Sequence, residues 1–237
     1  MKLTKYTHAC VRLEKEGGVL VLDPGTFSES AEALSGAQAV LVTHEHADHI
    51  DTKAVVAALE SNRDLALYAP EGVAGQLRGE TPAAADRIHS VEPGQSFQAA
   101  GFDIRSFGGQ HALIHPQIPV VANIGFLVDG NVYHPGDSFI IPDGIKVQTL
   151  LVPLHAPWSK SAEVVDFVIG VRAPRAFQIH DGLLNENGLG IVEGHVKRIG
   201  AKYGTEYRHL AARESVEVYA AAPVHSPVSR KREITAS

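Results

Sequence analysis

The chain has 237 residues and a formal net charge of −6, because 27 acidic residues outnumber 21 basic ones. At 44% hydrophobic and 20% charged, it has the composition of a folded globular protein. The acidic balance disfavours nucleic acid as the main partner, and no apolar run is long enough to span a membrane. The N-terminal segment lacks the apolar core of a secretory signal, and the single cysteine, Cys10, excludes a disulfide framework. We therefore expect a cytoplasmic protein.

Hydrophobic patterning predicts strands and helices in three successive parts of the chain. The first part has expected strands at 3–8, 10–15, 18–23, 39–42 and 65–70, and helices at 54–62 and 71–79. The second part has only strands, at 87–91, 95–99, 102–108, 121–129 and 131–134. The third part has strands at 149–154, 176–180 and 215–220, and helices at 161–171 and 190–204.

Two β-rich halves with helices outside them predict an α/β fold of four layers, an αββα sandwich. We expect it to form one domain over residues 1–222. The segment 223–237 mixes proline, serine and basic residues, which predicts a mobile C-terminal tail.

The residues that carry chemistry follow the apolar run at 39–42, in the sequence Thr-His-Glu-His-Ala-Asp-His. In an extended segment, residues two apart point to the same side, so His44 and His46 can offer two imidazoles to one ion. Asp48 and His49 lie where the chain turns toward a helix and aim at a neighbouring volume. Four strong ligands within six residues exceed what one ion with open positions takes from one loop, so the motif predicts two adjacent metal ions.

This segment resembles the signature of the metallo-β-lactamase superfamily, and the resemblance covers the chain up to about Ala220. It implies an αββα sandwich with two metal ions at one edge. It also implies that His44 and His46 hold the first ion with a third histidine, and that Asp48 and His49 hold the second with a last one. An aspartate would bridge both ions.

The resemblance assigns the remaining ligands to three later segments. The third histidine is expected at His111, after a glycine pair that permits close backbone approach, with His115 as the alternative or a rim residue. The bridging carboxylate is expected at Asp137, in a Pro-Gly-Asp turn. The last ligand is expected at His180, where an apolar strand ends.

Other residues are expected around the metal ligands. Asp23 would accept a hydrogen bond from a ligand imidazole and fix its tautomer. His134 would orient its neighbours, although a simply packed histidine fits equally well. His8 resembles a histidine of the ascorbate-phosphate lactonase-like branch, where it could face the site and bind substrate; the alternative is buried packing.

The loop after the expected strand at 149–154 has a less generic composition. His155 could protonate a leaving group or contact an anionic group of the substrate. Trp158 could form a wall of the substrate pocket, or it could only pack its own loop. Asp48 could orient the nucleophile as well as bind metal.

Departures from the family pattern narrow the expected reaction. Cys10 is not where the lactam-cleaving branch has its zinc-binding cysteine, and His46 stands where the oxygen-reducing diiron branch has a glutamate. We expect hydrolysis of a small-molecule ester or lactone by a metal-bridging hydroxide. The alternatives are a phosphodiesterase and a non-catalytic metal- or ligand-binding module. Two divalent ions are expected as cofactors, with Zn²⁺ favoured and Mn²⁺ or Fe open.

Overall fold

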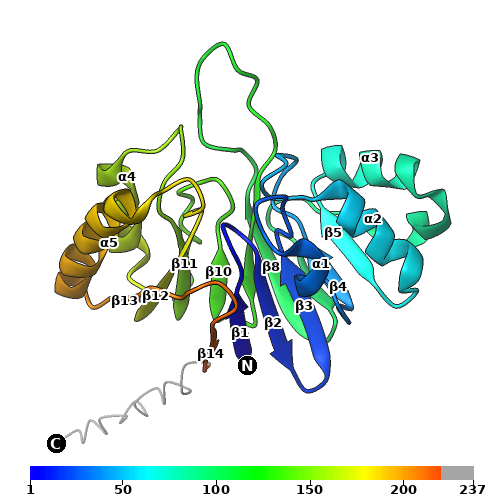
Figure 1. The fold of residues 1–237 in the computed structure, drawn as a ribbon, viewed down its shortest axis with the longest axis horizontal. Coiled ribbons are helices and arrows are strands. Elements are labelled where there is room, and N and C mark those ends of the chain that lie inside the picture. The colour runs from blue at the N-terminus through cyan, green and yellow to red at the C-terminus, as the bar shows by residue number, and fades with distance from the viewer. Residues whose placement is uncertain (220–237) are drawn as a thin grey trace, which may run out of the picture.

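The computed structural model describes residues 1–219 and contains two seven-stranded sheets packed face to face (Figure 1). The tail expected at 223–237, and the end of the domain expected at 222, lie outside the described residues. The first sheet has the order β14-β1-β2-β3-β4-β5-β6. Its strands are β1 (Lys2–Lys5), β2 (Val11–Lys15), β3 (Gly18–Leu22), β4 (Ala39–Leu41), β5 (Ala66–Ala69), β6 (Ile88–Ser90) and β14 (Ser215–Glu217).

The second sheet has the order β13-β12-β11-β10-β9-β8-β7. Its strands are β7 (Ser96–Ala99), β8 (Phe102–Gly108), β9 (Ile124–Val128), β10 (Val132–His134), β11 (Thr149–Pro153), β12 (Arg175–Ile179) and β13 (Glu206–Arg208). Strands β10 to β13 pair in parallel, whereas β7 to β10 pair antiparallel.

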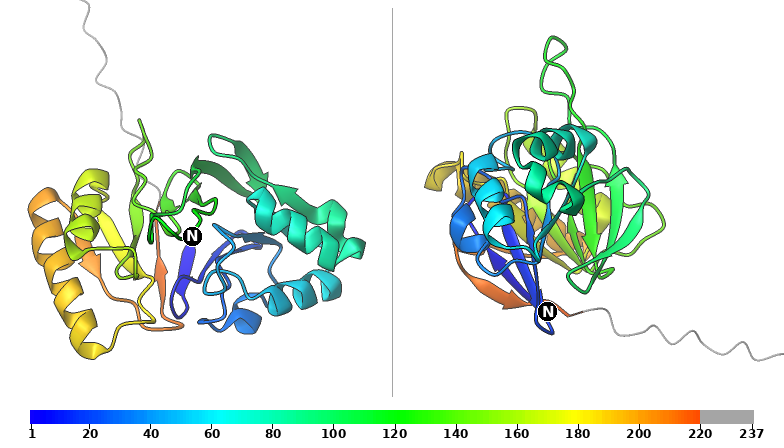
Figure 2. Two further views of the ribbon diagram at one scale, coloured as in Figure 1. Left: turned by 90° about the horizontal axis from the view of Figure 1, so that it is seen from above. Right: turned by 90° about the vertical axis from the view of Figure 1, so that its right-hand side faces the viewer.

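Helices cover the outer face of each sheet and complete the four expected layers (Figure 2). The first sheet carries α1 (Ser30–Ala33), α2 (Thr52–Ser61) and α3 (Glu71–Glu80), and the second carries α4 (Ser161–Val171) and α5 (Glu186–Gly200). Short 3₁₀ turns lie at Pro82–Arg87 and Ala201–Tyr203. In the described part of the chain, no helix combines the length and the apolar character needed to cross a bilayer.

The alternation of side chains along the strands places the core between the sheets. In β3, Leu20 and Leu22 face the second sheet, while Val21 packs under the outer helices. In β9, Phe126 faces inward and Leu127 faces the other helix layer. This two-residue period is a property of extended chains, and it explains why the central strands are apolar on both faces.

The structure corrects several expected boundaries. The last long helix begins at Glu186 rather than at residue 190, because the Asn185 side chain caps it by accepting a hydrogen bond from Gly188 N–H at 2.9 Å. It ends at Gly200, and a 3₁₀ turn follows. The strand expected at 121–129 begins only at Ile124. The short elements α1 and β13 were not predicted.

The strands that carry the expected site residues all run in the same direction. Strands β3 and β4 are parallel, and β1 runs with them because two antiparallel pairings separate it from β3. In the second sheet, β8 likewise runs with β10, and β10 is parallel to β11 and β12. The carboxyl ends of these strands lie at one edge of the sandwich, as is usual for ligand sites in α/β folds.

Candidate metal centre

Residues 43–51 form the loop between β4 and α2 and supply the first four candidate ligands. The main-chain N–H groups of His49 and Ile50 both donate to His46 O, which turns the chain sharply after the extended segment. Asp51 then caps α2 by accepting a hydrogen bond from Ala54 N–H at 3.1 Å. This turn separates the His44 and His46 pair from Asp48 and His49.

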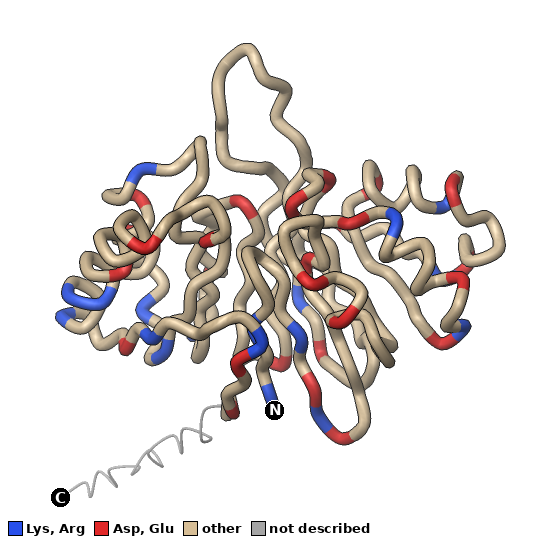
Figure 3. The backbone as a smooth tube through the Cα atoms, viewed as in Figure 1, with Lys and Arg blue, Asp and Glu red and all other residues tan. Residues whose placement is uncertain are grey.

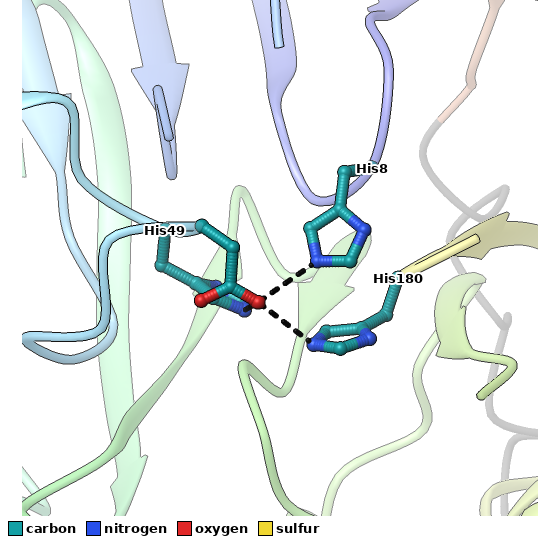
Figure 4. Close-up of side chains that lie close together, drawn as sticks. His8, His49 and His180 are labelled. Carbon is teal, nitrogen blue, oxygen red and sulfur yellow. Dashed lines mark hydrogen bonds and ion pairs between the residues drawn. The ribbon is translucent and has the colours of Figure 1, made fainter. Parts of the chain in front are cut away.

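Two groups of candidate ligands result, and within each group the ligand atoms lie within 4.8 Å of one another. The first group consists of His44, His46, His111 and Asp137. The second group consists of His8, Asp48, His49 and His180 (Figure 4). The structure therefore brings together all seven residues expected as metal ligands and adds His8 to the second group.

Asp137 lies between the two groups. Its Oδ1 is 3.0 Å from His49 Nε2, and its Oδ2 is 3.2 Å from His111 Nε2 and 3.1 Å from His180 Nε2. His44 Nε2 lies 3.9 Å from the same Oδ2. One carboxylate thus faces ligand atoms of both groups, which is the arrangement that a bridging ligand requires.

Four of the histidines have their Nδ1 atoms fixed by the protein. His44 Nδ1 lies 2.9 Å from Thr43 Oγ1, and His49 Nδ1 lies 2.6 Å from Asp23 Oδ2. His111 Nδ1 lies 2.6 Å from Ala112 O, and His180 Nδ1 lies 2.6 Å from His155 O. Because each Nδ1 faces an acceptor, its proton lies there and the Nε2 atom is left to point inward.

The ring nitrogens that point into the centre are unusual because they are buried and make no hydrogen bond. His44, His49, His111 and His180 all have a buried Nε2 with no hydrogen-bond partner, as does Oδ1 of Asp137. A buried polar atom without a partner is costly, and five such atoms converging at one place call for a ligand. Imidazole nitrogens and carboxylate oxygens are donors that suit divalent transition metals, so these residues fit a two-metal centre.

The electrostatics of the metal-free centre follow from burial and from the close carboxylates. Burial acts to lower the pKa of His180, but Asp137 and Asp48 outweigh it and raise that pKa to about 9. Burial also acts to lower the pKa of His49, but Asp137 and Asp23 outweigh it and raise that pKa well above the usual range. The facing imidazoles in turn hold the pKa of Asp137 well below its usual range, despite its burial. These shifts favour protonated imidazoles at His49 and His180 in the metal-free protein, so protons would compete with metal ions for these nitrogens.

Asp23 lies beneath the ligands and organises several groups. Its carboxylate accepts hydrogen bonds from Thr43 N–H at 2.8 Å and from Thr43 Oγ1–H at 2.7 Å, besides its contact with His49. His134 is also buried; its Nε2 donates to Ala9 O at 2.9 Å, and its Nε2 lies 3.7 Å from Asp23 Oδ2. Thr43 was not singled out from the sequence, although it directly precedes the motif.

The loop 154–160 brings Trp158 to the site. Its indole Nε1–H donates to Asp137 Oδ2 at 3.0 Å, and its ring meets the His111 ring edge-on at 5.8 Å between centroids. His155 contributes its main-chain oxygen to His180, and its imidazole makes no hydrogen bond to the described residues. His115 is exposed and accepts a hydrogen bond from Gln117 N–H, so it stays outside both groups.

Comparison with known proteins agrees with this geometry. The model of the beta-lactamase superfamily domain matches residues 2–180. Protein Rv0786c of Mycobacterium tuberculosis is 39% identical over 83% of this chain and 91% of its own. A UPF0173 metal-dependent hydrolase of Chelativorans sp. is 30% identical over 66% of this chain and 70% of its own.

A solved structure confirms the fold independently of sequence. Igni18, a metallo hydrolase of Ignicoccus hospitalis, superposes with a TM-score of 0.70 over 93% of this chain and 99% of its own, at 16% identity. The expected αββα sandwich is therefore correct. The chain belongs to the beta-lactamase superfamily and, within it, to the UPF0173 family of metal-dependent hydrolases.

Proposed function

We propose that the protein is a two-metal hydrolase that cleaves an uncharged ester or lactone of a small molecule. The observation that carries this proposal is the pair of ligand groups that share Asp137 and leave five buried polar atoms without partners. His44, His46 and His111 would hold one ion, and Asp48, His49 and His180 the other. Zn²⁺ suits a centre so rich in imidazole, and the carboxylates leave room for Mn²⁺ or Fe.

When bound, the two ions would lower the pKa of a water molecule and polarise the substrate carbonyl. The chain itself positions the reacting groups. The Asp48 side chain is 21% exposed, against 4% for Asp137, so Asp48 is the carboxylate that substrate and water can reach. One Asp48 oxygen contacts His8, and the other is available to orient the attacking water and to receive its proton. Trp158 stands against Asp137 and limits the site on one side.

The loops around the centre favour an uncharged substrate over a phosphodiester. The loop 109–123 rises above the sheets and carries no charged side chain (Figure 3). In the loops 23–29, 43–51, 135–142 and 154–160, the only Lys or Arg is Lys160, which pairs with Glu163. Phosphate groups are usually bound by Arg, Lys or a helix N-terminus, and of the first two only the ion-paired Lys160 lies on these loops.

Exposed apolar side chains lie on loops around the centre. Phe27 is 47% exposed and packs against the His8 ring at 5.2 Å, and Leu113 and Leu183 are 56% and 50% exposed. Phe27 contacts His8, whereas Leu113 and Leu183 follow His111 and His180 by two and three positions in the chain. These side chains support an apolar group on the acyl or alcohol part of the substrate.

The test compares metal content and turnover of purified protein. Metal-replete protein is assayed with p-nitrophenyl esters, lactones and bis-p-nitrophenyl phosphate, beside His46→Ala and Asp137→Ala, with His115→Ala as a matched control outside the centre. We expect esters or lactones to be cleaved, and both centre variants to lose metal and turnover while His115→Ala keeps them. Full metal content and turnover in Asp137→Ala would refute the proposal, and faster cleavage of the phosphodiester would refute its substrate class.

A further inference from the structure

His8 lies between β1 and β2 and is fully buried. Its backbone has φ +63°, a left-handed conformation that is uncommon for a residue other than glycine. His8 O accepts a hydrogen bond from His180 N–H at 3.1 Å, and the two imidazole rings lie 4.0 Å apart. The N-terminal strand is therefore joined directly to the turn that presents the last ligand. Such a strained position persists only where its surroundings hold it, and such positions gather at functional sites.

The hydrogen bonds of His8 define which ring nitrogen carries the proton. Gly182 N–H donates to His8 Nδ1 at 3.2 Å, so the lone pair of the neutral imidazole lies on Nδ1. The proton is then on Nε2, which lies 3.1 Å from Asp48 Oδ2 and donates to it (Figure 4). Both nitrogens of His8 are used within the protein.

This tautomer excludes two roles that the position alone would allow. A nitrogen that carries a proton has no lone pair for a metal ion, so His8 is not a ligand although it lies in the second group. A fully buried ring with both nitrogens engaged also leaves no polar atom of His8 free for substrate. What remains is its bond to Asp48.

We propose that His8 is a positioning residue that holds the Asp48 carboxylate in the orientation needed for the second metal ion. This rests on the proposed function, which makes Asp48 a ligand. The oxygen that His8 holds is the one nearest the other ligands of that group, at 3.5 Å from His180 Nε2 and 3.9 Å from His49 Nε2. Asp48 is the most exposed carboxylate of the centre and lies on a loop. Without the hydrogen bond from His8, its side chain would therefore be the most free of these carboxylates to rotate.

Two variants that differ by one methylene test this role. In His8→Gln the amide can reach the place of Nε2 and donate to Asp48, whereas in His8→Asn it is too short. Asparagine tolerates the left-handed backbone, so His8→Asn is expected to fold, and the Tm of the metal-free variant checks this. Metal binding is followed by titrating Zn²⁺, and separately Mn²⁺, into metal-free protein. Trp158 is the only tryptophan in the sequence, and its indole N–H donates a hydrogen bond to Asp137. Its fluorescence should therefore change when a metal ion binds at Asp137.

We expect His8→Asn to weaken one of the two metal equivalents by about 10- to 100-fold, as for other partners of metal ligands, and to leave the other equivalent unchanged. His8→Gln should recover most of that affinity. Equal losses in both variants would show that His8 is itself a ligand, and unchanged affinity in both would show that it positions nothing; either result overturns the proposal. If the affinities change as expected but no ester or lactone is cleaved, the proposed function fails and the role of His8 stands.

Discussion

Raising the pH from 7 to 9 should tighten metal binding strongly, because protons and metal ions compete for the same nitrogens. The pKa of His180 in the metal-free protein is about 9, since Asp137 and Asp48 outweigh the effect of burial. At pH 7 only about one molecule in 100 then has an unprotonated His180, which weakens the apparent metal affinity by about 100-fold, or about 2.7 kcal/mol. His49 has a pKa that is also raised, so a second proton adds to this cost.

The logarithm of the apparent Kd should therefore fall by about one unit for each pH unit near pH 7 from His180 alone, by more where His49 adds to it, and less steeply as pH approaches 9. Calorimetric titration of chelator-buffered Zn²⁺ measures this slope, and repeating it in buffers of different ionisation enthalpy counts the protons released. We expect at least one proton per protein molecule at pH 7. His115→Ala should give the same slope, because this exposed histidine lies outside the centre. A Kd that does not change between pH 7 and 9, with no proton released, would refute the reasoning.

Three further outcomes follow from the same geometry. The raised pKa of His180 contributes stability to the metal-free protein that is complete below about pH 6.5 and is lost as pH rises through about 9. Chemical denaturation should show a loss of up to about 3 kcal/mol from this group, and an unfolding free energy that rises over this range would contradict it. Asp23→Asn removes the negative charge and, with its remaining oxygen on Thr43 N–H, places an NH2 donor opposite His49 Nδ1–H. Metal affinity should therefore fall by about 10- to 100-fold in the same titration, and wild-type affinity would count against the tautomer assignment. Trp158→Phe keeps an aromatic ring but removes the N–H donated to Asp137, so kcat/KM on the best ester should fall by about three- to tenfold, a loss of about 1 kcal/mol, while metal content measured by mass spectrometry stays full.

The sequence predicted the fold and the candidate ligands better than the surroundings of those ligands. His44 to His49 are adjacent in the chain and follow a buried strand, so their grouping is a local property of extended backbone and one turn. His111 was assigned from the family resemblance, with the glycine pair before it as support. The structure gives Gly108 and Gly109 φ values of +95° and +128°, which other residues rarely adopt.

The role of His8 could not be read from the sequence because it depends on distant partners. Its hydrogen bonds reach Asp48 and Gly182, which are 40 and 174 positions away in the chain. Local patterning contains no information on which nitrogen of an imidazole finds a donor. The contribution of His155 through its main-chain oxygen was missed for a similar reason, since side-chain chemistry does not indicate which carbonyl groups a fold will use.

The same reasoning applies to the short elements. Strand β13 has only three residues and pairs with β12 at a sheet edge, so its existence depends on the neighbouring strand rather than on its own propensity. The start of α5 was placed four residues late because the capping residue, Asn185, lies in a segment rich in polar residues and glycine that resembles a loop. A capping residue can be recognised in a sequence only when the helix that it caps has already been placed.

The order in which the chain is made has a consequence for how the centre is filled. The candidate ligands run from His44 to His180, and the strand that carries His8 is held on one side by β14 at Ser215–Glu217. A growing polypeptide therefore cannot assemble both ligand groups until the segment that carries His180 has been made. If both groups bind metal, as proposed, the second group can be filled only after that segment has folded against the first part of the chain.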